Sequence, residues 1–465
     1  MQKQNYTFLS MIKKYVSSSV LLILATVAAL VVANLPATRD WYHDVWMNEV
    51  SLSIGGMNLF SHNGENMNLG QFINDFLMAI FFLSVGLELK REIFCGGELS
   101  TVKKAMLPVI GACGGMLMPV IVFFVACRMT GGNDIMERGM AIPMATDIAF
   151  SLGVLSMFSK RVPLGLKVFL AALAVADDLG GIIVIAIKYT DHLSLMHLGG
   201  ALLCAGLCLI AAWRNIMSKM FYFAVGIVMW WCMLNSGIHA TIAGVLLAFC
   251  VPARLHNGTK YYIEKIRGLI DCFPHYEVTA ADKHTPNLLT DDDIQNLRSI
   301  ESSSDHLIST LQDMEDVLRN PINFFIIPLF AFANAGVYFG GMSLMNLFEG
   351  VGLGVFLGLL IGKFIGVFTA SWISIKLKIV QMPENATWPA FAGVAMLCGI
   401  GFTVSMFMAS LSYPLDLPVE PMGHGPMYMY SLLNDAKLGI LCGTIASAIC
   451  GSIILNFTLP KATKG

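Results

Sequence analysis

The feature that most constrains the fold is a succession of apolar segments, each about as long as a helix that crosses a bilayer. Such a helix needs about 20 predominantly apolar residues, and the chain offers twelve candidates. They cover approximately residues 17–36, 71–90, 105–127, 138–158, 164–188, 196–213, 218–235, 237–252, 322–341, 350–375, 389–411 and 436–459. Charged residues make up only 13% of the 465, about half the share in soluble domains. The sequence therefore predicts an all-α polytopic membrane protein with twelve transmembrane helices.

The distribution of basic residues predicts the orientation, because cytoplasmic segments collect lysine and arginine. With the N-terminus inside, the cytoplasmic segments carry Lys90, Arg91, Lys103, Lys104, Lys160, Arg161, Lys167, Arg214, Lys219, Lys376, Lys378, Lys461 and Lys464. The external segments carry Arg39, Arg128, Arg138, Lys188 and Lys437. This asymmetry favours an even number of spans with both termini cytoplasmic.

One polar segment, residues 254–320, interrupts the apolar rhythm. Within it Leu311, Met314 and Leu318 recur at helical spacing. We interpret 254–320 as a cytoplasmic insert with one or two amphipathic helices, between spans 1–8 (residues 1–253) and spans 9–12 (residues 321–465). Two roles remain open for it, a solvated linker with a helix packed on the membrane domain, or a partner-binding or sensing element.

Two adjacent acids, Asp177 and Asp178, lie in the middle of the apolar stretch from Leu164 to Tyr189. An acid at the bilayer centre costs about 2.5–3.5 kcal/mol on insertion scales, and acids in such places mark ion or proton pathways. Their like charges also oppose joint ionisation. The pair is therefore predicted to bind the ion and the protons that the protein handles.

Two of the expected spans contain helix-disrupting residues at depth. Span 4 has Pro143 followed by Thr146 and Asp147, and span 11 has Gly399 and Gly401. Irregular backbone at this depth is tolerated only beside protein or a watery cavity. Interrupted helices in equivalent positions are typical of transporters built from inverted repeats, and spans 3–5 and 10–12 fit that scheme.

A lone cation, Lys363, lies about midway along span 10 and needs an anion or helix C-terminal carbonyls. The deep acids available are Asp147, Asp177 and Asp178. Neighbouring residues on a helix point about 100° apart, so Asp177 and Asp178 cannot share one partner in the same way. One is expected to face Lys363 and the other to line the ion site; the sequence leaves open which.

Ordered motifs along the whole chain resemble the NhaA family of sodium/proton antiporters. They are Phe82-Leu-Ser-Val-Gly-Leu-Glu88-Leu-Lys-Arg-Glu92, Thr146-Asp147-Ile-Ala-Phe-Ser-Leu-Gly-Val-Leu, Ala176-Asp177-Asp178-Leu-Gly, Ser236-Gly237-Ile-His239-Ala-Thr-Ile-Ala-Gly244, Pro328-Leu-Phe-Ala-Phe-Ala-Asn-Ala-Gly336, Gly362-Lys363 and Cys398-Gly-Ile-Gly-Phe-Thr403. The resemblance implies inverted-topology repeats with two broken, crossing helices (spans 4 and 11) in a bacterial inner membrane.

The resemblance also assigns roles to particular residues. Asp177 and Asp178 become the ion- and proton-binding carboxylates, with Thr146 and Asp147 as further candidate ligands for Na+. Asp147 then balances helix N-termini, and Lys363 balances C-termini and pairs with Asp177. The candidates for pH response are Asp75, Glu88 and Glu315, expected near the cytoplasmic entrance, and His239, expected at the subunit or external side. For His239 a histidine satisfied at a helix junction is the competing interpretation.

The function implied is electrogenic export of Na+, and of Li+, in exchange for external protons by a secondary active transporter. It is not an enzyme, it needs no cofactor and no nucleic acid, and its partners are Na+, Li+, H+ and the lipid bilayer, with a homodimer as a candidate assembly. The alternatives are another monovalent cation/proton exchanger and, more remotely, an intramembrane aspartyl protease, whose two acids share a proton. The long insert and Asp316, where the family has histidine, depart from the pattern and put the pH set-point in doubt.

Overall fold

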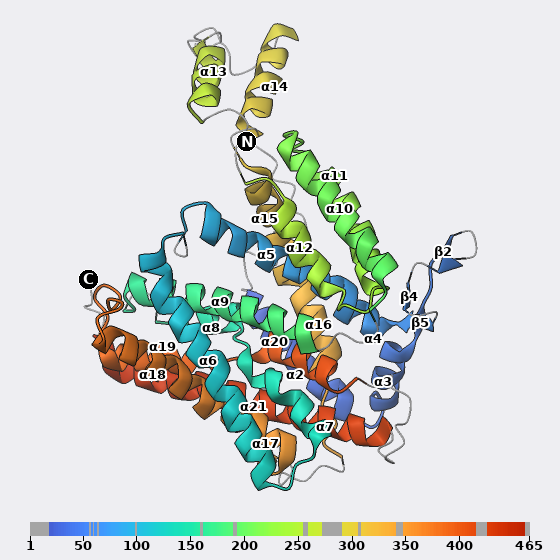
Figure 1. Ribbon diagram of the computed structural model, residues 1–465, viewed down its shortest axis with the longest axis vertical. Helices are drawn as coiled ribbons and strands as arrows, with labels where there is room; N and C mark the ends of the chain where they lie inside the picture. Colours follow the sequence, from blue (N-terminus) through green and yellow to red (C-terminus); the bar gives the residue numbers. More distant parts are fainter. Residues whose placement is uncertain are drawn as a thin grey trace, which may run out of the picture.

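The computed structural model describes residues 18–54, 57–58, 60–62, 65–97, 100–158, 161–188, 193–253, 259–271, 291–305, 308–340, 347–414 and 426–460, and these are mostly helical (Figure 1). The helices are α2 (Ser18–Asn34), α3 (Arg39–Met47), α4 (Leu69–Phe72), α5 (Met78–Phe94), α6 (Val102–Met129), α7 (Asp134–Glu137), α8 (Ile148–Ser156), α9 (Leu164–Lys188), α10 (Leu195–Trp213), α11 (Lys219–Leu234), α12 (Thr241–Cys250), α13 (Thr259–Asp271), α14 (Asp291–Asp305), α15 (Thr310–Pro321), α16 (Ile327–Asn334), α17 (Gly350–Leu357), α18 (Lys363–Lys376), α19 (Trp388–Leu397), α20 (Phe402–Ser412) and α21 (Pro426–Thr458). Lys160, Lys461 and Lys464 and parts of the polar segment (254–258, 272–290 and 306–307) lie outside the described residues.

Seven helices in the described part of the chain are long and apolar enough to cross a membrane, and ten spans result if each bent pair of helices counts as one. The seven are Leu69–Phe94, Ala105–Met129, Leu164–Lys188, Leu195–Trp213, Thr310–Asn334, Gly350–Lys376 and Tyr428–Thr458. Two shorter apolar helices, Lys219–Leu234 and Thr241–Cys250, accompany them. The chain therefore folds as an all-α polytopic membrane protein.

Two of the bent pairs meet in the interior. Helix α7 continues into the 3-10 helix Arg138–Met144, which contains Pro143, and together they meet α8 at an angle of 44°. Helix α19 leads into α20 at 43°. The two breaks are in direct contact, because the backbone N–H of Asp147 donates to the carbonyl of Ile400 at 2.7 Å. At this contact a Cβ added to Gly401 would lie 3.0 Å from the carbonyl oxygen of Ala145, so only glycine allows the approach without a shift.

Three π-helical turns interrupt long helices in the described part of the chain, and the sequence analysis did not predict them. They are Ile73–Leu77 before α5, Ile322–Ile326 before α16 and Gly358–Gly362 before α18. Such turns free backbone groups and are frequent at functional sites. Here one contains Asp75 and another ends immediately before Lys363.

The apolar core consists of two clusters that meet around α9. Leu166, Phe169 and Leu173 in the first half of α9 belong to one cluster, whereas Ile182 and Ile185 in its second half belong to the other. The pair α19 and α20 is divided in the same way: α19 belongs to the cluster of the first half of α9, and α20 belongs to the cluster of its second half. The fold therefore leaves a boundary between two cores, and polar groups of α9 and of the break lie at it.

Two features lie outside this helical body. Short antiparallel strands, which the all-α expectation did not include, form the sheets β1-β5-β4 and β2-β3 at the right-hand edge of Figure 1. The strands are β1 (Glu49–Val50), β2 (Ser53–Ile54), β3 (Met57–Asn58), β4 (Ser61–His62) and β5 (Glu65–Asn68). The described part of segment 254–320 forms three helices, where the sequence predicts one or two: α13 and α14 project at the top of Figure 1, and α15 packs against α5.

Candidate functional site

The two adjacent acids lie in the interior of the protein. Helix α9 has 25 residues, long enough to cross a bilayer, and carries Asp177 and Asp178 near its middle. Their exposed fractions are 1% and 3%. Because burial of an unpaired carboxylate is costly, the groups that surround each acid decide its charge state and its use.

Asp177 is held by a cation and a hydroxyl. The Nζ atom of Lys363 lies 2.6 Å from Asp177 Oδ2, and the Thr146 hydroxyl lies 2.8 Å from the same oxygen. Lys363 is fully buried, and its ammonium also donates to the carbonyl oxygen of Met144, at the end of the 3-10 helix. One ammonium therefore compensates both a carboxylate and a helix C-terminus.

Asp178 has surroundings of the opposite kind. Its electrostatic neighbours are three acids, Asp177, Asp147 and Glu88, and one cation, Lys363. The Oδ1 atoms of Asp178 and Asp177 are both buried without a hydrogen-bond partner. Two carboxylate oxygens are thus available to a ligand, and the hard oxygen atoms that they offer suit a small cation or protons.

Asp147 joins the two interrupted helices. Its Oδ1 atom accepts from the Phe150 backbone N–H at 2.9 Å and so caps α8. Its Oδ2 atom accepts from the Thr403 hydroxyl at 2.7 Å and from the Thr403 N–H at 3.1 Å, in the first turn of α20. The acid therefore faces the N-terminal ends of two helices, where a negative charge is stabilised.

We call the region where the interrupted helices meet the crossing, and define it by Thr146, Asp147, Asp177, Asp178, Lys363 and Thr403. Further polar contacts hold the crossing together. The Thr146 hydroxyl also lies 3.0 Å from the Cys398 carbonyl oxygen, and its single proton can serve either that oxygen or Asp177. The Ser405 hydroxyl donates to the Ile142 carbonyl at 2.8 Å. Backbone groups freed by each break are thus satisfied by the other interrupted helix.

The four residues expected to respond to pH form two separate groups. The sequence analysis expects Asp75, Glu88 and Glu315 near the cytoplasmic entrance. Asp75 lies thirteen residues from Glu88, about 20 Å along one span, and contacts His239, with 3.3 Å between Asp75 Oδ1 and His239 Nε2. Asp75 and Glu88 therefore occupy opposite ends of the same span.

Glu88 and Glu315 do lie near each other, in what we call the Glu315 cluster (Glu88, Arg91, Glu92, Glu315 and Arg319). Glu315 Oε1 accepts from Arg91 at 2.6 Å and from Arg319 at 3.3 Å. The second residue of the Glu315-Asp316 pair is exposed and contacts Arg319. The charge of Glu88 also acts on Asp178 of α9.

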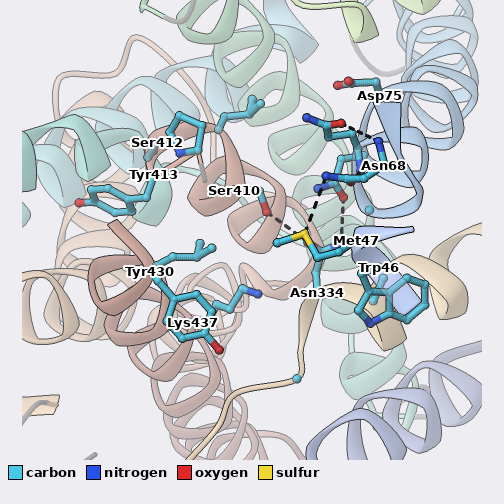
Figure 2. Close-up of a pocket in the computed structure, with 18 of the residues that line it drawn as sticks. Trp46, Met47, Asn68, Asp75, Asn334, Ser410, Ser412, Tyr413, Tyr430 and Lys437 are labelled. Atoms are coloured by element: carbon cyan, nitrogen blue, oxygen red, sulfur yellow. Dashed lines mark hydrogen bonds between the residues drawn. The ribbon is translucent and has the colours of Figure 1, made fainter. Parts of the chain in front are cut away.

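Asp75 and His239 line a polar cavity of about 850 Å³ (Figure 2). Figure 2 shows Tyr413, Tyr430 and Lys437 on one side and Asp75, Asn68 and Trp46 on the other, with Ser410 and Asn334 between them. Asp177 and Asp178 are not among the residues that line it. The other four residues of the crossing are also absent from its lining.

Some polar residues of these regions are absent from the sequence-derived candidates. Arg91 bonds to Glu315, and the Asn334 amide donates to Asn74 Oδ1 at 2.9 Å and accepts from Ser410 at 3.2 Å beside the polar cavity. A polar residue inside an apolar span was the available signal for Asn334.

The described residues contain no cluster of three or more His, Cys, Asp or Glu that could hold a metal ion, so a cation at the crossing would need hydroxyl or backbone oxygens as well.

Comparisons with known proteins find relatives along almost the whole chain. A family model described as Na+/H+ antiporter 1 matches residues 10–455. The protein named Na(+)/H(+) antiporter NhaA from Bacteroides thetaiotaomicron is 47% identical over 445 residues, which cover 96% of each chain. Proteins of the same name from Phocaeicola vulgatus and Shigella dysenteriae are 46% identical over 468 residues (98% of this chain, 97% of the relative) and 38% identical over 435 residues (94% of each).

Proposed function

The chain belongs to the Na+/H+ antiporter 1 family, and on that premise we propose that it is a secondary active transporter that exports Na+ in exchange for external protons. Li+ is the second cation that we expect it to carry. The exchange is electrogenic and proceeds by alternating access, in which one site faces either side of the membrane in turn.

The observation that carries this proposal is the unequal pair of buried carboxylates. Asp177 Oδ1 and Asp178 Oδ1 have no protein partner, and they belong to neighbouring residues. Sodium needs oxygen ligands to replace its water, and two ionised carboxylates with the Thr146 hydroxyl and carbonyls of the breaks can supply them. Asp147 is a further candidate ligand that already holds both helix N-termini.

Competition at this pair couples the two fluxes. When sodium leaves, Asp178 faces other acids without a close cation, so it takes up a proton, while Asp177 returns to Lys363. The pair titrates as a coupled unit. An electrogenic cycle needs a second proton, which is carried either by Asp177 or by the Lys363 ammonium that sodium displaces. In either case two protons enter the cell for each Na+ that leaves.

The proposed topology has twelve spans in a bacterial inner membrane, with both termini cytoplasmic. The proposal counts the three bent pairs and the two shorter apolar helices as spans beside the seven long helices. In this topology the Glu315 cluster lies at the cytoplasmic end of α5 and the polar cavity is external. The crossing breaks are then spans 4 and 11 of two inverted repeats.

The pH-response roles are proposed for Glu88 and Glu315 on the cytoplasmic side and for Asp75 and His239 on the external side. Residues 254–320 form the cytoplasmic insert between residues 1–253 and 321–465. Helix α15 of the insert packs on the membrane domain through buried Leu311 and Met314. The proposed assembly is a homodimer.

An aspartyl protease is disfavoured because both acids of the pair come from α9 and one is bound by Lys363.

The test is cation-dependent proton flux in proteoliposomes, with Na+, Li+ and K+ over a pH series. The Asp178→Asn variant should fold, because asparagine is isosteric and cheaper to bury, and should lose exchange entirely. Asp316→Asn, at an exposed position, is the control and should exchange normally. Normal exchange by Asp178→Asn, or no sodium-dependent flux in the wild type, would contradict the proposal.

A further inference from the structure

One face of α21 lines the polar cavity with three hydrogen-bonding side chains. Tyr430, Asn434 and Lys437 follow one another at spacings of four and three residues, which places them on the same helix face. All three line the cavity, and Figure 2 shows Lys437 extending from α21 into it. We call these three residues the α21 face.

Two of these side chains are unpartnered within the described part of the chain. Among its residues, neither the Lys437 ammonium nor the Asn434 amide makes a hydrogen bond or an ion pair. Asn434 is only 7% exposed, and buried polar side chains as a rule have hydrogen-bond partners. The unmet donors of the α21 face therefore point to a ligand that occupies the cavity.

The acids that line the cavity do not supply the missing partner, because each already lies beside a basic side chain. The pairs are Asp40 with Arg39 at 3.0 Å, Asp75 with His239 at 3.3 Å and Asp134 with Arg128 at 3.9 Å. Lysine and arginine outnumber aspartate in the lining of this cavity by four to three. Low-dielectric walls focus such a positive field and concentrate counter-ions. The ligand expected for the α21 face is therefore an anion.

We propose that the α21 face binds a small inorganic anion with the size and charge of chloride. The Lys437 ammonium supplies the charge, and the Asn434 amide and the Tyr430 hydroxyl supply further hydrogen bonds. Lysine acts as a point charge, without the planar fork by which arginine recognises carboxylates. A spherical anion therefore suits this donor set better than an organic acid does.

A bound anion changes the charge along the proposed exit of Na+. This consequence rests on the proposed exchange function and on the topology that makes the cavity external. The ammonium of Lys437 repels a cation that leaves the crossing, whereas an ammonium neutralised by chloride does not. Chloride outside the cell is therefore expected to speed export.

Binding is tested without transport, by the line width of the chloride NMR signal with the full-length protein in detergent. Gluconate keeps the ionic strength constant while chloride is varied. Wild type should broaden the signal in a saturable way. Lys437→Gln should weaken binding at least about tenfold, the loss expected for a hydrogen bond to a charged group.

Two further variants separate the site from general charge and from misfolding. Lys437→Arg keeps the cation, and Lys188→Gln removes one at an exposed position of the same cavity. Both should bind chloride nearly as well as wild type, and thermal unfolding in detergent checks that each variant is folded. Absence of saturable broadening by wild type, or equal affinity in wild type and folded Lys437→Gln, would overturn the site.

A second measurement connects the site to export. Proteoliposomes with a clamped membrane potential exchange Na+ for protons with either chloride or gluconate on the side that the polar cavity faces. Wild type should slow at least about tenfold in gluconate, the lower end of the effect of a focused field on ion rates, and Lys437→Gln should run equally in both anions. Equal chloride dependence of the two proteins would overturn the proposal. Failure of wild type to exchange in either anion would instead refute the proposed function, and the NMR test of the site would stand.

Discussion

The crossing and the Glu315 cluster both hold acids against basic side chains, but in different surroundings. At the crossing, Asp177 and Lys363 are almost completely buried, and each finds its compensation only in protein groups. In the Glu315 cluster the side chains of Arg91 and Arg319 are 31% and 54% exposed. Solvent and salt therefore screen the second region and not the first. From this difference in screening we expect the charges at the crossing to bind the transported ions and those of the Glu315 cluster to adjust the pH dependence of exchange.

The largest effect is expected at the crossing, from Lys363→Gln. This change leaves Asp177 with the Thr146 hydroxyl alone, and removal of one partner of a buried ion pair costs about 3–5 kcal/mol. Thermal unfolding in detergent should show the loss, and Lys363→Arg, which keeps a cation, should lose much less. A Lys363→Gln protein as stable as wild type would show that Asp177 is already protonated and unpaired.

The same variants decide whether Lys363 carries a proton. Arginine stays protonated, whereas a buried lysine can release its proton. We expect Lys363→Arg to retain electrogenic exchange, as a residue that compensates a helix end would allow. The measurement is the proton-to-sodium stoichiometry from reversal potentials in proteoliposomes. Electroneutral exchange by an active Lys363→Arg variant would instead make Lys363 one of the two proton carriers.

A smaller effect is expected from Thr403→Val, which removes one hydroxyl donor from Asp147 and keeps the side-chain shape. The backbone N–H of Thr403 and that of Phe150 still bind the acid. A lost hydrogen bond to a buried charge costs about 1.5–3 kcal/mol. Unfolding in detergent should report this loss, with Thr369→Val on α18, whose hydroxyl bonds only within its own helix, as the control. Equal stability of the two variants would contradict the bridging role of Asp147.

In the Glu315 cluster, Glu315→Gln should cost at most about 1 kcal/mol, because its arginine partners are partly exposed. The pH profile of exchange should shift while the maximal rate is retained. High salt should narrow the difference between variant and wild type, since it screens this region. Loss of all exchange at every pH would place Glu315 in the ion site and remove the distinction between the two regions.

The smallest effect is expected from deleting residues 259–305, which contain α13 and α14. The cut must end before Ser309, because Ser309 caps α15, Thr310 bonds to the Met217 carbonyl, and Asp313 binds Lys219. Proteoliposomes with the deletion should retain turnover. Complete loss of exchange in a correctly inserted deletion would show that the insert is integral to transport.

The sequence was most informative where the membrane leaves few alternatives. Deep charges are so costly that Lys363 could be matched only with Asp147, Asp177 or Asp178, and it contacts Asp177. That the two adjacent aspartates would have different surroundings followed from the 100° between neighbouring helix residues. Composition likewise determined the helical membrane class, because few soluble folds contain so little charge.

The rest depends on packing that local patterns do not encode. Asp75 and His239 are 164 residues apart, and their contact arises only from how α5 packs against α12. The π-helical turns occur in apolar sequence that suits an α-helix equally well, as in Gly358–Gly362.

The charge count at the crossing fixes how the exchanger would use membrane voltage. With Asp147, Asp177 and Asp178 ionised and Lys363 protonated, the buried groups carry two net negative charges. Two protons cancel them, whereas one Na+ leaves one negative charge. In the proposed cycle, a cell interior that is negative therefore favours outward passage of the Na+-loaded site, whereas the proton-loaded site is neutral and returns without electrical work. Each 100 mV supplies about 2.3 kcal/mol per cycle, enough to hold about a fiftyfold ratio of external to internal sodium.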